Sequence, residues 1–123
     1  MNIVGLGRAG CQIAEKFKNY EQYNVFCIDA EDRDYETFLS VALQNSHEDY
    51  EKNYKAVDLS ACRGKTALVL SGAGKISGCV LRILEQLGDR DLEIIYIKSD
   101  ETALPAEASM RDKIVLGVLQ QYA

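Results

Sequence analysis

The chain has 123 residues, of which 47% are hydrophobic, and it carries a formal net charge of −5. This size fits a single domain over residues 1–123 with a proper hydrophobic core. The negative charge argues against a general surface for nucleic acid or for anionic membranes, and no apolar run is long enough to span a bilayer. The four cysteines are too widely spaced for a zinc site or a small disulfide framework, which favours free thiols in the cytoplasm. Since the first expected strand begins at residue 2, we expect no signal peptide.

Strands alternate with amphipathic helices in the first third of the chain. Residues 2–5 and 25–28 are short apolar runs, typical of buried parallel strands. The helical spacing of apolar side chains predicts helices over residues 9–19 and 33–45.

The pattern continues after a polar interval. Residues 46–54 are expected to form a loop in which the single histidine, His47, is solvated. Residues 56–59 fit a short edge strand. The remaining expected elements are a strand over 66–70, a helix over 77–88, a strand over 93–97, and a helix from Pro105 to about residue 122.

This alternation predicts an α/β fold, a Rossmann-like three-layer α/β/α architecture with a mainly parallel sheet. In such folds ligands bind beyond the carboxyl ends of the strands, where the strand order reverses.

Two glycine loops lie where an expected strand is followed by a helix. The first glycine loop is Gly5–Gly10 and the second is Gly72–Gly78. Glycine permits tight turns and a close approach of the backbone to a ligand, and a helix N-terminus attracts phosphate. The pair predicts a nucleotide held between the two loops.

Asp29 strengthens the nucleotide interpretation of the first loop, which matches the dinucleotide-binding pattern. It follows the next expected strand, about twenty residues after Gly10, where an acid can accept hydrogen bonds from a ribose. The alternative is that the glycines only permit close packing of strand against helix.

Lys75 does not complete a P-loop, because Val69 stands where that motif needs glycine and Ile76 stands where it needs serine or threonine. Lys75 is either a point charge near phosphate or an exposed loop lysine.

The two loops together resemble a known family. Gly10 to Phe17 resembles the first nucleotide loop and helix of tubulins, and Gly10-Cys11 followed by an amide residue is similar to bacterial FtsZ. The second glycine loop resembles the Gly-Gly-Gly-Thr-Gly-Ser/Thr-Gly signature of the tubulin/FtsZ superfamily. The loop matches this signature at Gly72, Gly74, Ser77 and Gly78. Ala73 is a small replacement, whereas Lys75 and Ile76 depart from the signature.

The resemblance implies GTP or GDP bound across the carboxyl edge of the sheet. The implied contacts are Gly7, Arg8, Ala9, Gly10 and Cys11 around the phosphates, Gln12 at the guanine, Asp29 toward the ribose, and Gly72, Ala73, Gly74, Lys75, Ile76, Ser77 and Gly78 in the second loop. No catalytic and no metal-ligating residue is assigned, and Mg²⁺ contact by Asp29 or Glu31 stays open.

The match covers only the front of the family's GTPase domain. The family's γ-phosphate loop is not visible between Asn45 and Thr66, and neither its central helix nor its acidic catalytic loop is present. The chain is therefore expected to be a fragment or a reduced relative that binds nucleotide weakly and does not hydrolyse GTP usefully alone. The family role implies self-association into filaments.

Two other functions stay open. One is the NAD-binding domain of an oxidoreductase, which Asp29 and the first glycine loop favour, while Gln12 and the second loop count against it. The other is a structural module that uses its glycines for packing and binds a protein partner.

Overall fold

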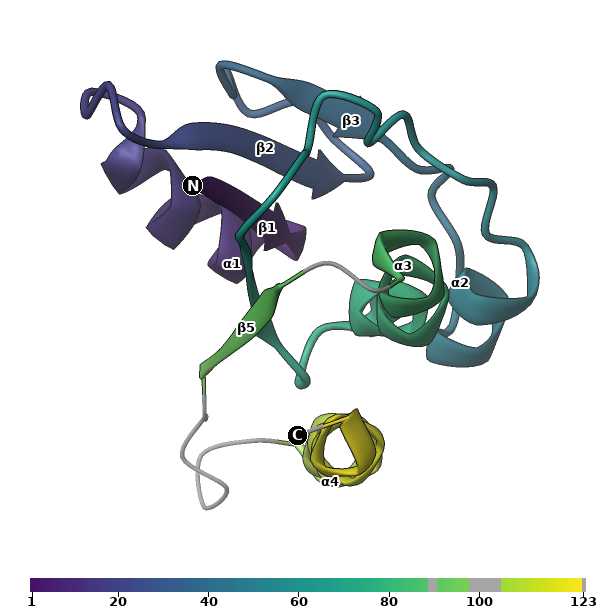
Figure 1. Ribbon diagram of the computed structural model, residues 1–123. Helices are drawn as coiled ribbons and strands as arrows, with labels where there is room; N and C mark the ends of the chain where they lie inside the picture. The colour runs from purple at the N-terminus through teal and green to yellow at the C-terminus, as the bar shows by residue number, and fades with distance from the viewer. Residues whose placement is uncertain (89–90, 98–104, 123) are drawn as a thin grey trace.

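The computed structural model, which describes residues 1–88, 91–97 and 105–122, contains one five-stranded parallel sheet flanked by helices (Figure 1). The strands are β1 (Asn2–Leu6), β2 (Asn24–Asp29), β3 (Phe38–Ser40), β4 (Thr66–Ser71) and β5 (Leu92–Ile97). The helices are α1 (Gly7–Ala14), which continues as a 3₁₀ turn (Glu15–Phe17), α2 (His47–Lys52), α3 (Val80–Leu87), which is preceded by a 3₁₀ turn (Lys75–Cys79), and α4 (Ala106–Tyr122).

The strand order is β3-β2-β1-β4-β5, and all neighbouring strands are parallel. The chain moves from β1 to β2 and β3 on one side, and then crosses to β4 and β5 on the other. This order confirms the expected α/β, Rossmann-like fold and places the topological switch between β1 and β4.

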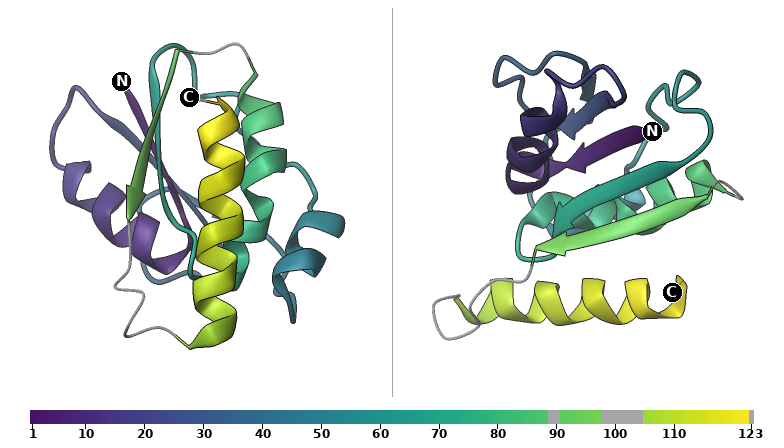
Figure 2. Two further views of the ribbon diagram at one scale, coloured as in Figure 1. Left: turned by 90° about the horizontal axis from the view of Figure 1, so that it is seen from below. Right: turned by 60° about the vertical axis from the view of Figure 1, so that its left-hand side comes forward.

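The two faces of the sheet are covered unequally (Figures 1 and 2). The face with Ile3, Val25 and Val69 packs against α1 through Cys11 and Ala14. The opposite face packs against α2, α3 and α4, through the buried side chains Tyr50, Val80, Ile83, Leu84, Leu87, Val115 and Leu119. Strands β1, β2 and β4 are buried on both faces, which explains why their sequences are continuously apolar rather than alternating.

The expected helix over 33–45 is wrong. Residues 30–37 form a connection without a helix, and Phe38 and Leu39 pair with Cys27 and Ile28 as the edge strand β3. Apolar neighbours that suggested one face of a helix instead face opposite sides of a strand, a case where tertiary pairing overrides a local periodicity.

The expected loop over 46–54 is also wrong, because it contains α2. The Ser46 hydroxyl caps this helix by accepting a hydrogen bond from the Asp49 N–H, and acidic residues occupy its first turn. Tyr50 then buries its ring in the core. The expected strand over 56–59 does not form, although Val57 and Leu59 are buried.

The other elements occur close to their expected positions. Helix α1 begins two residues earlier than expected and becomes a 3₁₀ turn at Glu15, and the expected helix over 77–88 is divided into a 3₁₀ turn and α3. Gly88 ends α3 with a positive φ of 60°, as expected for a C-terminal glycine.

Candidate functional site

A cavity of about 390 Å³ lies between the two glycine loops at the switch point. Parallel pairing sets Leu6 of β1 beside Leu70 of β4, so both loops leave the sheet at the same edge. The cavity is lined by Leu6, Gly7, Arg8, Ala9 and Gln12 from the first strand and helix, by Ser71, Ala73, Gly74 and Ile76 from the second loop and its strand, and by Ala108 from α4. We call it the switch-point cavity.

Arg8 is the only charged residue among the described residues that line the switch-point cavity. The whole chain carries a net charge of −5, so a cavity whose described lining holds a cation and no carboxylate is a local exception. Arg8 and Gln12 are both exposed. The first N–H groups of α1 lack partners within the helix, and the helix dipole adds partial positive charge at the same end. The cavity is therefore suited to an anion.

Packing explains two glycines of the first loop. A Cβ on Gly10 would collide with the backbone carbonyl of Val69 in β4, and one on Gly5 would lie 2.7 Å from the Cα of Cys11. Gly7 differs, because its φ of +74° favours glycine. The close approach of α1 to β4 thus requires glycine at position 10 whether or not a phosphate is bound.

Cys11 turns its thiol away from the cavity. Its Sγ lies 3.4 Å from the Gly5 carbonyl oxygen and 3.6 Å from that of Ile28, and it can donate to either one, and the side chain is fully buried. A hydrogen bond with Cys27, together with burial, raises the pKa of the Cys11 thiol far above its ordinary value. Only the backbone of Cys11 can face a ligand in this arrangement.

Two glycines of the second loop also serve packing. A Cβ on Gly72 would collide with the Tyr96 hydroxyl and would lie 3.1 Å from the Cα of Asp112, and one on Gly78 would collide with the carbonyl of His47. Gly74 is the exception, since a Cβ there would meet no atom within 4 Å. Gly74 faces open space beside the cavity, where a ligand can approach the backbone.

Ser77 closes the second loop on itself. Its buried hydroxyl lies 2.7 Å from the Gly74 carbonyl and 3.0 Å from the Gly72 carbonyl, and it can donate to either one. From α4, the Arg111 Nε donates to the Ala73 carbonyl at 3.0 Å. The loop is therefore shaped by its own serine and held by an arginine that sequence reasoning missed, because no local pattern links residue 111 to residue 73.

Two neighbouring residues of the second loop, Lys75 and Ile76, line different cavities. The Ile76 Cγ2 lies 2.6 Å from where a Cβ on Gly7 would be, so its side chain bridges the two glycine loops and lines the switch-point cavity. Lys75 is exposed and lines a neighbouring cavity of about 360 Å³ with His47 and Arg111. The lysine does not line the switch-point cavity.

Asp29 lies at the expected edge, but both of its carboxylate oxygens are engaged. Leu6, the last residue of β1, pairs with Ile28, so Asp29 directly follows the partner of Leu6 at the end of β2. Asp29 is only 7% exposed. Its Oδ1 accepts from the Ala30 N–H at 2.8 Å, and its Oδ2 accepts from the Tyr35 hydroxyl at 2.7 Å.

Glu31, the other residue considered for Mg²⁺, is exposed and pairs with Arg33 at 3.2 Å. Within the described part of the chain, no group of three His, Cys, Asp or Glu side chains is arranged to hold a metal.

Among the helices that the structure describes, none is long and apolar enough to cross a bilayer.

His47 is not the solvated loop residue that the sequence suggested. It is the first residue of α2 and is half-buried, and its Nε2 is buried without a hydrogen-bond partner among the described residues. Burial, with a smaller contribution from the Arg111 charge, lowers the pKa of His47 below its ordinary value, although Glu51 and Glu48 oppose the shift.

Protonation of His47 should therefore destabilise the fold. A histidine with a lowered pKa in the folded state binds fewer protons than the unfolded chain, so the free energy of unfolding should fall as pH drops from about 7.5 to about 5.5. Urea unfolding at several pH values should show this loss, and His47→Gln should reduce it. Since His47 is the only histidine, an equal pH dependence in both proteins would contradict this prediction.

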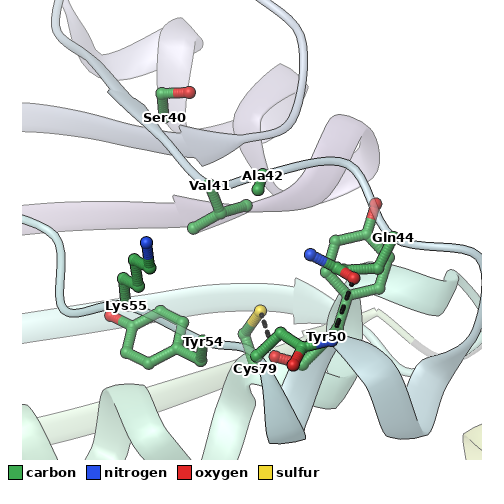
Figure 3. Close-up of a pocket in the computed structure, with 9 residues that line it drawn as sticks. Ser40, Val41, Ala42, Gln44, Tyr50, Tyr54, Lys55 and Cys79 are labelled. Atoms are coloured by element: carbon green, nitrogen blue, oxygen red, sulfur yellow. Dashed lines mark hydrogen bonds between the residues drawn. The ribbon is translucent and has the colours of Figure 1, made fainter.

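A further cavity, of about 310 Å³, lies beyond the carboxyl end of β3 (Figure 3). Tyr50, Tyr54, Val41 and the Cys79 thiol form part of its wall. Burial raises the pKa of the Cys79 thiol to about 12, and its Sγ donates to the Tyr50 carbonyl at 3.6 Å. This thiol is therefore packed and protonated rather than reactive.

Two polar residues that line the same cavity pair with each other, since the Asn53 amide donates to the Gln44 Oε1 at 3.2 Å.

No family model matches the chain, and no curated protein matches it. Its function is therefore inferred from the geometry of the site.

Proposed function

We propose that the chain binds a guanine nucleotide, with the phosphates at the switch-point cavity. The observation that carries the proposal is the cavity itself, which lies between two glycine loops at adjacent strand ends and whose described lining presents Arg8 and no carboxylate. A phosphate there would meet the N-terminus of α1, where N–H groups and the helix dipole favour an anion.

One observation counts against the oxidoreductase alternative. The ribose acceptor that an NAD site needs is engaged, because the Asp29 Oδ2 accepts a hydrogen bond from the Tyr35 hydroxyl.

The preference for guanine rests on Gln12 and on the resemblance to tubulin and FtsZ. Gln12 is exposed and lines the cavity, and its amide can pair with a purine edge. The same resemblance extends the proposal to self-association. GTP hydrolysis is not proposed, because phosphoryl transfer needs a group that orients water, and the described lining offers Arg8 only for charge stabilisation.

The structural-module alternative is favoured by the packing roles of Gly5, Gly10, Gly72 and Gly78. It does not account for Arg8, Gln12 and Gly74, which line the cavity and are exposed. The two functions therefore make different predictions for variants of these three residues.

Calorimetric titration of GDP, GTP, ATP and NAD with Mg²⁺ present tests the proposal. We expect the guanine nucleotides to bind roughly tenfold more tightly than ATP, the difference that one good hydrogen bond can supply. Gln12→Leu should remove the preference, whereas Gln22→Leu, an exposed site outside the cavity, should keep it. Tighter binding of NAD would favour the oxidoreductase, and no binding of any nucleotide would favour the structural module.

A further inference from the structure

The connection between β2 and β3, residues 30–37, folds back over Asp29. The Tyr35 hydroxyl donates to the Asp29 Oδ2 at 2.7 Å. Arg33, at 3.9 Å from the same oxygen, forms a longer ion pair. The expected helix of this region is replaced by a segment that places a phenol on Asp29, a buried acid at this edge of the sheet.

Three further contacts hold Tyr35 in this position. Its N–H donates to the Asp32 carboxylate at 3.2 Å, and its ring packs against the α1 side of the core. The next residue, Glu36, donates its N–H to the Glu15 Oε1 at 2.9 Å. Asp34, immediately before Tyr35, has a φ of 63°, a left-handed conformation that is uncommon outside glycine and that Asp adopts more readily than most residues.

Each carboxylate oxygen of Asp29 already accepts a hydrogen bond in this arrangement. Its Oδ1 accepts from the Ala30 N–H, its Oδ2 accepts from Tyr35, and it is 7% exposed. Asp29 ends β2 next to Ile28, whose partner in β1, Leu6, lines the switch-point cavity. A ribose hydroxyl that reached from the cavity toward β2 would compete with the Tyr35 hydroxyl for the Asp29 Oδ2.

We propose that Tyr35 determines the sugar specificity of the site, because its hydroxyl occupies the position on Asp29 that a ribose hydroxyl would take. This inference rests on the proposed nucleotide binding. With Tyr35 in place, the site binds ribonucleotides and 2′-deoxyribonucleotides alike. Removal of the phenolic hydroxyl leaves the Asp29 Oδ2 free to accept a hydrogen bond from the ribose.

The experiment compares GDP with 2′-deoxy-GDP by calorimetry on the whole chain. For the natural sequence we expect affinities within about twofold of each other. Tyr35→Phe should raise the affinity for GDP by roughly tenfold and leave the affinity for 2′-deoxy-GDP unchanged, since a hydrogen bond to a charged acceptor is worth about that factor. Tyr23→Phe is the matched control, because Tyr23 packs on the same side of the core and contacts Phe17 rather than Asp29.

The double variant Tyr35→Phe, Asp29→Asn tests whether the gain acts through Asp29. It should lose the discrimination that Tyr35→Phe creates, because the amide removes the charge of the acceptor. Equal GDP to 2′-deoxy-GDP ratios in the natural chain and in a folded Tyr35→Phe variant would overturn this inference while nucleotide binding stands. Failure of all these proteins to bind either nucleotide would overturn the proposed function and this inference with it.

Discussion

Gly10→Val should prevent the domain from folding. A Cβ on Gly10 would collide with the Val69 carbonyl of β4, which is central backbone and cannot move without disrupting the sheet. The two extra methyl groups of valine enlarge the clash. Overpacking of this kind costs about 3 kcal/mol or more, which is a large part of the stability of a small domain.

Circular dichroism and urea unfolding of Gly10→Ala and Gly10→Val would measure this effect, with the alanine variant the less severe. Gly74→Ala is the matched control, because a Cβ there meets nothing within 4 Å and the φ of −76° suits any residue. We expect Gly74→Ala to remain folded. A stable Gly10→Val domain would mean that α1 does not approach β4 as closely as the structure indicates.

Because Gly10 is needed for packing, its presence is weaker evidence for phosphate binding than the sequence suggested. Sequence reasoning assigned Gly10 to phosphate approach, but the same glycine is required by the contact between α1 and β4. A loss of nucleotide binding in a Gly10 variant would therefore not identify the site. Gly74, which has no such contact, is the better probe of backbone approach by a ligand.

The elements that the sequence predicted well are those whose signal is local and continuous. Strands β1, β2 and β4 are apolar on both faces, so their composition alone marks them as buried. Helix α4 extends over Ala106–Tyr122, after Pro105, as expected. The alternation of these elements predicted a mainly parallel sheet, and the structure then gave the strand order that places the switch between β1 and β4.

The predictions that the structure contradicts concern segments whose conformation depends on distant partners. Phe38 and Leu39 become a strand only because the edge of β2 is available for pairing. Val57 and Leu59 are buried without strand pairing, so their apolar character was correct but their conformation was not. The cap of Ser46 on α2 was a local signal, and the capping rule applied to Ser46 and the acids after it would have found the helix.

The site shows the same division between local and distant signals. The positions of the two glycine loops followed from strand and helix boundaries, whereas the Tyr35 bond to Asp29 and the Arg111 bond to Ala73 join residues whose connection has no sequence signature. Ile76 could be recognised as a departure from a glycine pattern, but only the structure shows that it bridges to Gly7.

Arg8→Glu should abolish most nucleotide binding without unfolding the domain. Arg8 is exposed and is the only charged side chain among the described residues that line the switch-point cavity. A charge-assisted hydrogen bond to phosphate is worth about 1.5–3 kcal/mol, and reversal of the charge adds repulsion. We therefore expect GDP affinity to fall by about 100-fold, measured by calorimetry at low salt, where such contacts are screened least.

Lys16→Glu supplies the matched control, because it makes the same change in net charge in the 3₁₀ turn that continues α1, and Lys16 is exposed and outside the cavity. It should reduce GDP affinity by no more than about twofold, the effect expected of a screened distant charge. Equal losses in the two variants would show that only the overall charge matters. Unchanged GDP affinity in a folded Arg8→Glu variant would place the nucleotide elsewhere, since a phosphate in this cavity could not avoid the reversed charge.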